Sequence, residues 1–398
     1  MKNGWQTRTL SEVSAINYGY TESAASEPVG PRFLRITDIQ DDRVDWDVVP
    51  YCKIDKADLP KYRLASGDIV FARTGATTGK SFLVDNPPDA VFASYLIRLR
   101  LVDKNLLPEF VLLFFQTTGY WQSIKDGSSG SAQGGFNATK LGALTVPVPP
   151  LAEQQRIVSI LDEAFAVIAT AKANAEKNLQ NARALFESHL QSVFTQRDCG
   201  WVEKPLGDFC SFENGDRGTN YPSKSARTET GIPFINAGHL TDEGVDLETM
   251  DYIPRERFDL LSNGKIRQGD ILFCLRGSLG KFAAVGNLSE GAIASSLVIV
   301  RPDKTVLNDF LVAYFRSPLC ATMINRFKNG AAQPNLSAQS LRNFIAPVPS
   351  LETQESVVEQ LTDLRAETQR LARIYERKLA ALAALKKSLL HQAFTGEL

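Results

Sequence analysis

The apolar and polar residues of this chain form, in two regions, a pattern typical of domains that contain both strands and helices. Short apolar runs such as "DIVFA", "YLIRLRLV" and "SLVIVR" lie in residues 1–150 and 198–350, separated by many Gly, Asn and Asp residues. Such runs between turn residues favour β-strands. Longer apolar segments at 107–124 and 307–327 favour helices. We therefore expect two mixed regions, each with several short strands and few helices.

A second pattern predicts two long helices, at about 151–195 and 351–394. Each segment follows a Pro-x-Pro sequence, contains no Gly or Pro, and is rich in Ala, Leu, Glu, Gln, Lys and Arg. Glu352 and Glu355 near the start and Lys386 and Lys387 near the end suit the helix dipole. At 1.5 Å per residue, each helix would extend roughly 65 Å.

Both predicted helices carry a seam of residues spaced alternately by three and four. In the second helix the seam is Leu361, Leu364, Thr368, Leu371, Tyr375, Lys378, Leu382, Leu385 and Leu389, with Leu379 beside the poorly suited Lys378. In the first helix it is Leu161, Ala164, Ile168, Ala171, Ala175, Asn178, Ala182, Leu185 and His189. A Leu-rich seam facing an Ala-rich one predicts an antiparallel coiled coil. The alternative is that each helix packs on its own mixed region.

The chain repeats itself once. "GW" at Gly4–Trp5 recurs at Gly200–Trp201, "GDIVF" at 67–71 recurs as "GDILF" at 269–273, and "PVPPLAEQQ" at 147–155 recurs as "PVPSLETQE" at 347–355. "ALFESHLQSVFT" at 184–195 corresponds to "ALKKSLLHQAFT" at 384–395. Blocks in the same order at nearly constant offset indicate a tandem duplication.

The duplication predicts an α+β fold with two similar mixed α/β domains and two long helices in an antiparallel coiled coil. The expected boundaries are 1–150 for the first domain, 151–197 for the central helix, 198–350 for the second domain and 351–398 for the C-terminal helix.

Composition and charge narrow the function classes. The chain has 398 residues, 43% of them apolar, and a formal net charge of −1. Residues 1–150 hold 16 basic and 16 acidic side chains, and residues 198–350 hold 16 and 17. Neither region is basic, so coating of nucleic acid by charge alone is excluded. Any contact with DNA needs basic residues gathered on one face, or help from a partner.

Cysteine, histidine and hydropathy patterns predict a reduced cytoplasmic protein without a structural metal. The five cysteines form no CxxC pair, and the three histidines are far apart in sequence. No apolar run approaches the length of a membrane span, and the N-terminal residues lack the apolar core of a signal peptide.

The stretch "ARTGATTGKS" at 72–81 is close to a phosphate-binding P-loop. Only three residues separate Gly75 from Gly79, where the P-loop has four, and the second copy has Phe282 at the place of Ser81. A P-loop also opens into a helix, whereas "SFLVDNPPDAVFASYLIRLR" predicts a strand, a Pro turn and a strand. The stretch is therefore not expected to bind a nucleotide.

The same stretch and its counterpart "LFCLRGSLGKFAAV" instead predict turns that present cations. Arg73, Gly75, Gly79 and Lys80 reappear as Arg276, Gly277, Gly280 and Lys281. Arginine and lysine beside free backbone amides suit a DNA phosphate or a guanine edge. The alternative is a glycine hairpin whose charges are only solvated.

A second pair of loops, 125–141 and 328–341, carries Lys, Gly, Gln and Asn in similar order. Glycine allows close approach of the backbone to DNA, and Gln or Asn can pair with adenine. The alternative is a flexible polar loop. With polar residues on neighbouring loops, the candidate DNA-binding set is Arg35, Arg73, Thr74, Lys80, Lys125, Ser128, Gln133, Asn137, Lys140, Arg217, Asn236, His239, Arg276, Ser278, Lys281, Lys328, Asn329, Gln333 and Asn335.

The tetrapeptide "NPPD" at 86–89 resembles the [ND]-P-P-[YF] loop of adenine-N6 methyltransferases. Asp89 stands where that loop needs an aromatic residue to stack on a flipped base. The second copy has "GNLSEG" there instead. The chain is therefore not expected to be the methyltransferase itself.

Taken with the duplication, these motifs resemble specificity subunits of type I restriction-modification systems. The resemblance is carried by "PVPPLAEQQRIVSILD" and "PVPSLETQESVVEQL", by the turns "GDIVFARTGATTGK" and "GDILFCLRGSLGK", and by the terminal "LLHQAFTGEL". It covers essentially the whole chain. The second copy departs from it at Thr353 and Glu355, where "TQE" replaces the commoner "EQQ".

The resemblance implies two target-recognition domains that each read half of a split, asymmetric DNA sequence. It implies paired helices that set the gap between the half-sites and dock two modification subunits. The partners would be double-stranded DNA, these methyltransferase subunits and motor-nuclease restriction subunits. This chain would carry no catalytic residue and no cofactor. Two alternatives remain, an enzyme of nucleotide chemistry and a coiled-coil scaffold that no longer binds DNA.

Overall fold

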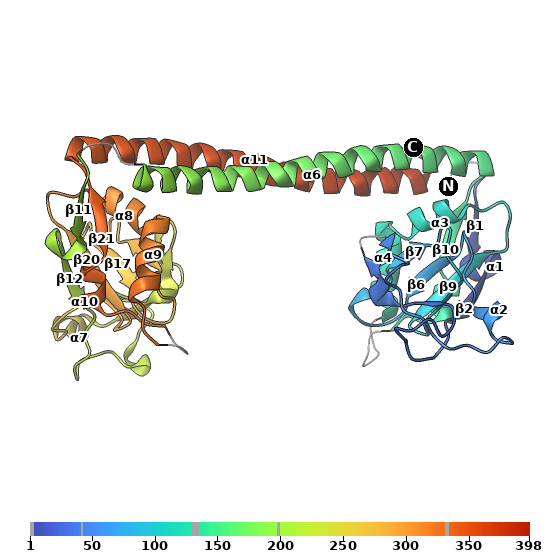
Figure 1. Ribbon diagram of the computed structural model, residues 1–398, viewed down its shortest axis with the longest axis horizontal. Coiled ribbons are helices and arrows are strands. Elements are labelled where there is room, and N and C mark those ends of the chain that lie inside the picture. The colour runs from blue at the N-terminus through green and yellow to red at the C-terminus, as the bar shows by residue number, and fades with distance from the viewer. Residues whose placement is uncertain (1–3, 41–42, 129–134, 197–199, 331–333) are drawn as a thin grey trace. The chain divides into compact units, whose positions relative to one another are not determined.

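Two compact units make up the chain. A computed structural model describes residues 4–40, 43–128, 135–196, 200–330 and 334–398. Unit 1 comprises Met1–Glu176 and Glu376–Leu398, and unit 2 comprises Lys177–Tyr375. Each unit therefore combines one mixed α/β region with part of both long helices (Figure 1).

The mixed region of unit 1 is built mainly of short strands. Its strands are β1 (Gln6–Thr9), β2 (Ser14–Tyr18), β3 (Arg32–Leu34), β4 (Ile39–Gln40), β5 (Arg43–Val44), β6 (Ile69–Ala72), β7 (Ser81–Leu83), β8 (Ala90–Phe92), β9 (Leu96–Leu101) and β10 (Thr145–Val148). Its helices are α1 (Leu10–Val13), η1 (Ile36–Asp38), α2 (Leu59–Tyr62), η2 (Gly75–Thr77), α3 (Pro108–Phe114), α4 (Thr118–Ser128) and α5 (Ala138–Gly142).

Unit 2 repeats this order with small changes. Its strands are β11 (Val202–Pro205), β12 (Cys210–Asn214), β13 (Ile232–Ile235), β14 (Leu240–Thr241), β15 (Gly244–Val245), β16 (Asp251–Ile253), β17 (Ile271–Cys274), β18 (Phe282–Ala284), β19 (Ala292–Ile293), β20 (Leu297–Pro302) and β21 (Ile345–Val348). Its helices are η3 (Leu206–Asp208), η4 (Lys224–Ala226), η5 (Ala237–His239), α7 (Arg255–Asp259), α8 (Asn308–Arg316), α9 (Pro318–Phe327) and α10 (Ala338–Arg342).

A four-stranded antiparallel sheet lies at the centre of each region, in the order β2-β9-β6-β7 and β12-β20-β17-β18. Strand β6 is buried on both faces, because Ile69 and Phe71 belong to one core cluster and Val70 and Ala72 to another. Its unbroken apolar sequence follows from this two-sided burial. Strand β17 is buried in the same way.

A smaller two-stranded sheet leads each region into its long helix. Strand β1 pairs antiparallel with β10, with Gln6 opposite Val148, and β11 pairs with β21, with Val202 opposite Val348. The repeated "GW" and "PVP" blocks therefore begin and end the same small sheet. The predicted fold class and its internal repeat are confirmed.

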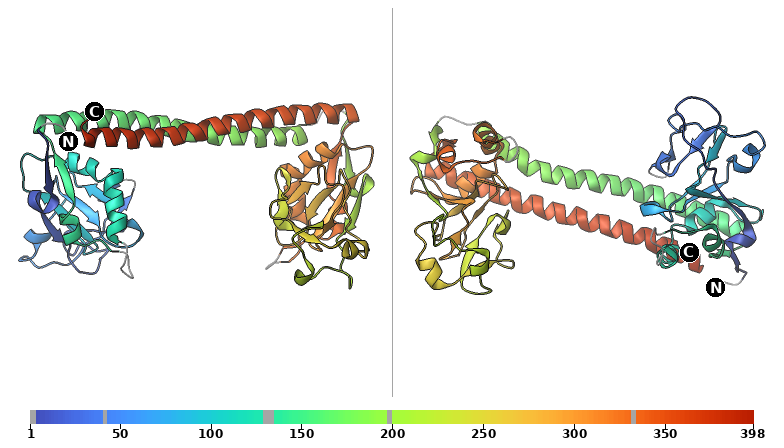
Figure 2. Two further views of the ribbon diagram at one scale, coloured as in Figure 1. Left: turned by 180° about the vertical axis from the view of Figure 1, so that it is seen from behind. Right: turned by 90° about the horizontal axis from the view of Figure 1, so that it is seen from below.

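The two long helices are α6 (Leu151–Thr195) and α11 (Leu351–Thr395), with bounds within one residue of those predicted. Within unit 1, Leu390 and Ala393 of α11 share a core with Ile157 and Leu161 of α6. Within unit 2, Leu190 and Phe194 of α6 share a core with Leu361 of α11. In each unit the start of one helix thus lies against the end of the other, in antiparallel pairing (Figure 2). The same residues also join the core of the mixed region, so both predicted modes of packing contribute.

The predicted seam is covered in each helix except at two positions, where the covered residue is the next one along; Ala182, His189, Leu382 and Leu389 are covered as predicted. Asn178 and Leu185 are exposed, whereas Leu179 and Phe186 are covered. The second helix shows the same exceptions, with Lys378 and Leu385 exposed and Leu379 and Lys386 covered. A repeat of 3.5 residues slowly rotates around a straight helix that has 3.6 residues per turn. A spacing of four residues where three was expected brings the seam back to the side that faces the partner helix. The prediction missed this step because it continued the 3-4 alternation.

Each central sheet contains a buried acid paired with an arginine. Asp68, 1% exposed, accepts hydrogen bonds from Arg100 at 2.7 Å, and Asp270 accepts from Arg301 at 2.7 and 2.8 Å. These aspartates are those of the repeated "GD" sequence before β6 and β17. Each carboxylate also accepts a backbone N–H three residues upstream, and so fixes the turn into its strand.

The described part of the chain has neither a helix suited to a membrane nor a metal-binding group of side chains. None of its helices is long and apolar enough to cross a membrane. Among the same residues, no group of three or more His, Cys, Asp or Glu side chains is arranged to hold a metal ion.

Candidate nucleic-acid interface

In unit 1, the predicted cationic turn is the hairpin between β6 and β7. Ala72 donates its N–H to Lys80 O at 2.8 Å, and Gly79 donates to Ala72 O at 2.9 Å. A strand, not a helix, follows the turn, as predicted. The hairpin contacts the second predicted loop directly, because Phe136 donates its N–H to Arg73 O at 2.9 Å. The structure thus brings the turn and the polar loop together.

The guanidinium of Arg73 lies over an aromatic ring. Its Cζ is 5.0 Å from the centre of the Tyr18 ring, and the Tyr18 hydroxyl accepts the N–H of Ala138 at 3.0 Å. Arg73 Nε is buried without a hydrogen-bond partner among the described residues. A cation over a ring is attracted by the ring's negative face. Arg73 is therefore half-buried and held, while Thr74 and the exposed Lys80 continue the turn.

The remaining candidates of unit 1 lie around the end of α4 and the start of α5. Lys140 Nζ donates to Gly127 O at 2.6 Å, and the Asn137 side chain caps α5 by accepting from Lys140 N at 2.8 Å. Lys125 is exposed, and Ser128 Oγ is buried with no partner in the described part of the chain. Gln133 lies outside the described residues.

The corresponding hairpin of unit 2, between β17 and β18, corrects the sequence alignment. Cys274 donates to Lys281 O at 2.7 Å, as Ala72 does to Lys80 O. Leu336 donates to Leu275 O at 2.9 Å, as Phe136 does to Arg73 O. The backbone counterpart of Arg73 is therefore Leu275, and Arg276 corresponds to Thr74. Matching the two arginines by identity was wrong, because the residue missing from unit 2 lies in the tip of the turn.

Arg276 consequently stands one position further out on its turn than Arg73, and it is exposed. It forms an isolated antiparallel bridge with Asn335, which in turn exchanges two backbone hydrogen bonds with Asn329, at 2.8 and 2.9 Å. Ser278 is exposed in the same turn, and Lys328 donates to Asn325 Oδ1 at 2.9 Å. Gln333 lies outside the described residues.

Lys281 links the hairpin to a third loop of unit 2. Its Nζ donates to Ala237 O at 3.0 Å, in the short helix η5. Asn236 caps η5, accepts from Gly238 N at 2.7 Å, and donates its backbone N–H to Nδ1 of the buried His239 at 3.2 Å. The Asn236 side chain also approaches Asp251 at 3.4 Å. Lys281 is thus brought to the neighbouring candidates Asn236 and His239, which lie more than 40 positions away in the sequence.

Arg35 and Arg217 are placed by local interactions. Arg35 forms two hydrogen bonds to Asp38, at 2.7 and 3.1 Å, and the bonded carboxylate raises the pKa of Arg35. Arg217 is exposed and donates to Ser295 O at 3.2 Å, next to Ser296, whose carbonyl accepts from Leu275. Arg217 therefore lies near the β17–β18 hairpin, whereas Arg35 is held within its own turn by Asp38.

Sequence reasoning missed several residues that build these clusters. Tyr18, which supports Arg73, is 41% exposed, and Tyr95, whose carbonyl accepts from Arg73 N, is 61% exposed. In unit 2, Asp251 holds Arg227 at 2.5 Å beside Asn236. Tyr18 and Tyr95 lie 55 and 22 positions from Arg73 in the sequence, so no local pattern pointed to them. Nothing in the sequence linked Arg227 and Asp251 to Asn236.

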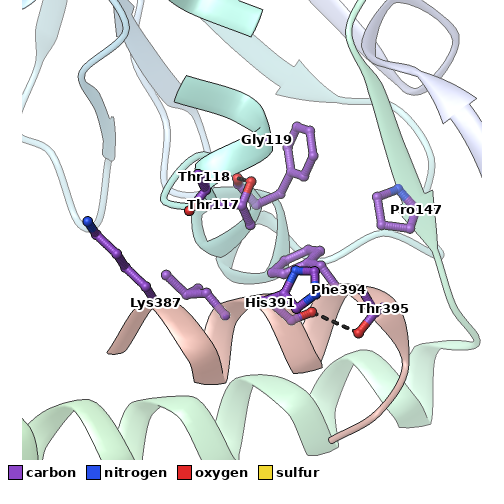
Figure 3. Close-up of a pocket in the computed structure, with 10 residues that line it drawn as sticks. Thr117, Thr118, Gly119, Pro147, Lys387, His391, Phe394 and Thr395 are labelled. Carbon is purple, nitrogen blue, oxygen red and sulfur yellow. Dashed lines mark hydrogen bonds between the residues drawn. The ribbon is translucent and has the colours of Figure 1, made fainter. Parts of the chain in front are cut away.

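A cavity of about 200 Å³ in unit 1 is lined by none of the candidate DNA-binding residues. It lies beside the last turns of α11, where His391 and Phe394 face Thr117, Thr118 and Gly119 (Figure 3). The matching N-cap bonds, Tyr120 N to Thr117 Oγ1 and Cys320 N to Ser317 Oγ, make Leu319 the counterpart of Gly119. Leu319 packs against the core of unit 2. The missing side chain at Gly119 therefore contributes to the cavity.

One family model matches the chain twice. The model is described as the type I restriction modification DNA specificity domain, and it matches residues 2–180 and 199–376. The chain belongs to this family. Each match covers a mixed region together with most or part of the long helix that follows it.

Curated relatives and a solved structure agree with the type I specificity family. The chain is 25% identical over 304 residues to the type I restriction enzyme EcoBI specificity subunit of Escherichia coli, over 70% of this chain and 64% of that one. It is 23% identical over 434 residues to the EcoKI specificity subunit of Escherichia coli K12, over 100% of this chain and 90% of that one.

The fold agrees with a chain solved in work on the structural basis of complex assembly and conformational transition of the type I R-M system. That chain has a TM-score of 0.80 and 20% sequence identity, with 100% of this chain and 99% of that chain covered. At this identity, the likeness shows that the two chains share a fold and nothing more.

Proposed function

We propose that this chain is the DNA-recognition subunit of a type I restriction-modification complex, and that residues 1–150 and 198–350 each read one half of a gapped target. The observation that carries the proposal is the repeated cluster of a glycine-rich hairpin and a polar loop in two copies of the DNA specificity family. Hairpin and loop backbones joined by hydrogen bonds form a preorganised surface, which reduces the entropy lost on binding.

The chemistry of the two clusters supports two different half-sites. Arginine can pair with guanine through O6 and N7, and asparagine can pair with adenine. Unit 2 presents the exposed Arg276 beside Asn335, whereas the same backbone position in unit 1 is Thr74. Unit 1 instead presents Lys80 beside an arginine that is held on Tyr18. The two units therefore offer different groups to the bases.

The segments 151–197 and 351–398, which contain α6 and α11, are proposed to set the gap and to dock two methyltransferase subunits, with restriction subunits added to the complex. The solved chain of similar fold comes from work on assembly of such a complex. The net charge of −1 supports binding of DNA together with partner subunits. Such partners would supply much of the positive charge that neutralises the DNA phosphates. We assign the chemistry to those subunits and no catalytic residue or cofactor to this chain, which would act in the cytoplasm.

A genome-wide map of N6-methyladenine tests the proposal. Cells with the neighbouring modification gene are compared with and without the gene for this chain. We expect one split motif to lose methylation when the gene is deleted. An unchanged map with an active modification subunit would favour the scaffold alternative.

Arg276→Ala is expected to weaken binding to the half-site read by unit 2 by about 10- to 100-fold, the cost of one good arginine–guanine pair. Binding is measured by titration of the complex with modification subunits against duplexes that carry substitutions in one half-site at a time. Arg73→Ala is expected to weaken binding to the other half-site, because it removes a cation from the β6–β7 hairpin.

Arg255→Ala is a matched control for Arg276→Ala. Arg255 is also an exposed arginine of unit 2, but it pairs with Glu290. It is expected to leave affinity for both half-sites unchanged. If Arg276→Ala bound its target as tightly as the control, the assignment of this hairpin to base recognition would be wrong.

A further inference from the structure

A buried glutamine lies at the start of each long helix, and the two make the same contacts. Gln154 Oε1 accepts the N–H of Leu107 at 2.9 Å, and Nε2 donates to Asn105 O and Pro149 O, both at 2.8 Å. Gln354 Oε1 accepts the N–H of Leu307 at 2.8 Å. Its Nε2 donates to Thr305 O and Pro349 O, both at 3.0 Å. Both side chains are 0% exposed.

These hydrogen bonds join three pieces of backbone in each unit. Gln154 is in the first turn of α6, Pro149 follows β10, and Asn105 to Leu107 lead into α3. Leu107 is the N-cap of α3, so its N–H has no partner within that helix. The glutamine therefore ties the direction of the long helix to the mixed region of its own unit.

We call the place where Gln154 connects α6, Pro149 and the residues before α3 the joint of unit 1. Neighbouring residues reinforce it. Asp103 accepts the N–H of Asn105 at 2.9 Å and pairs with Arg8 of β1 at 2.7 Å. Arg8 lies opposite Val146 of β10, the strand that leads into α6. In unit 2, Asp303 holds Thr305 through both its N–H and its hydroxyl. The loops before α3 and α8, which are hydrogen-bonded to Gln154 and Gln354, are therefore held in place by their own aspartates.

We propose that Gln154 and Gln354 are positioning residues that determine how strictly the complex selects the gap between half-sites. The proposal rests on the function proposed above and adds residues that belong to none of the loops assigned to DNA. A glutamine side chain serves here because one amide supplies the acceptor and both donors that three backbone groups require. A hydrophobic residue of similar size would leave those groups unpaired and the angle of the joint free to vary.

A small change of angle at such a joint has a large effect on the gap. At about 20 Å from the joint, well within a domain of about 150 residues, a tilt of about 10° moves a loop by about 3.5 Å. Neighbouring phosphates on one DNA strand are spaced by about 3.4 Å along the helix axis. A joint that is loose by this amount would accept targets whose gap differs by one base pair.

The test uses Gln154→Met and Gln354→Met in the full chain, assembled with its modification subunits. Methylation rates are measured on duplexes with the cognate gap and with gaps one base pair shorter and longer. We expect each variant to reduce the preference for the cognate gap by about tenfold, corresponding to the loss of one or two net hydrogen bonds. The preference for the correct bases within each half-site is expected to stay unchanged.

Val84→Ala is the matched control, because Val84 is buried in a core cluster of unit 1 that contains no residue of α6. It should lower thermal stability without changing gap preference. If Gln154→Met lowers stability and leaves the gap preference at the wild-type value, the glutamine is only structural and the proposal is overturned.

Two further readouts keep the test decisive. Gln154→Asn and Gln354→Asn keep an uncharged amide whose shorter side chain cannot reach all three backbone groups, so they carry the test if the Met variants do not fold. A split motif that is methylated in the wild type but tolerates every gap would overturn this proposal alone. Absence of any split motif in the wild type would overturn it together with the proposed function.

Discussion

Asp68→Asn is expected to lower the free energy of unfolding by about 3 kcal/mol, the lower end of the cost of breaking a buried ion pair. The carboxylate is 1% exposed, but the Arg100 side chain is 40% exposed, and solvent around it reduces the cost. Hydrogen bonding to Asp68 raises the pKa of Arg100, and the variant loses this stabilisation of the charged guanidinium, which stays protonated without its partner. Thermal or denaturant unfolding of the full chain measures the loss.

The internal repeat supplies a matched comparison for this prediction. Asp270→Asn in unit 2 should cost less, because Arg301 keeps Glu213 at 3.5 Å as a second acidic neighbour. In unit 1, the arginine of the ion pair has a second neighbour that is basic, not acidic. Arg98 occupies the position of Ile299 in unit 2 and is buried beside Arg100. Burial is the main reason that the pKa of Arg98 is lowered, and the positive charge of Arg100 is the second reason.

Arg98→Ile introduced into the Asp68→Asn protein should therefore cost less than Arg98→Ile alone. Equal losses for Asp68→Asn and Asp270→Asn would contradict the argument. They would show that the neighbouring charges do not contribute.

The duplication made much of this fold predictable from sequence. Repeated blocks fix the order of elements in both copies, and helices without Gly or Pro begin at recognisable Pro-x-Pro sequences. The repeated "GD" sequence was used only to find the repeat. Its physical meaning, a buried acid that holds a turn and an arginine, needed the hydrogen bonds of Asp68 and Asp270.

The candidate site was less predictable because loops are aligned by backbone hydrogen bonds and not by residue identity. Arg73 and Arg276 look equivalent in sequence, yet the bonds to Phe136 and Leu336 place them one position apart. The support of Arg73 by Tyr18 joins residues 55 positions apart, for which no local pattern exists. Identical residue types in two copies therefore gave the wrong register for this turn, and the assignment of its surface to DNA stays a prediction.

The seam of the long helices shows a similar limit. The alternation of three and four is correct for Leu161 to Ala175 and for Leu361 to Tyr375. The change to Leu179 and Leu379 depends on how far a straight helix has turned, which residue types alone do not reveal. Lys386, in the shifted register, has its Nζ 4.6 Å from the centre of the Phe165 ring, both within unit 1.

Removing seven residues from each long helix is expected to shorten the preferred gap by about three base pairs. Seven residues correspond to roughly 10.5 Å of helix, and three steps along one DNA strand span about 10 Å. The deletions are residues 172–178 of α6 and 373–379 of α11, which are matched segments in an antiparallel pair where Phe165 meets Lys386. They leave the helix ends that enter the two cores intact.

Binding to duplexes with a series of gaps measures the effect, and affinity for the original gap should fall by at least about 100-fold, the scale that separates correct from altered sites. Seven residues are close to two helical turns, so each half of the shortened helices keeps nearly its original facing side. Deleting only one of the two segments serves as a control, because the seams then fall out of register and no gap is bound well. A double deletion that still preferred the original gap would mean that some other part of the complex sets the spacing, since both helices would have changed length without effect.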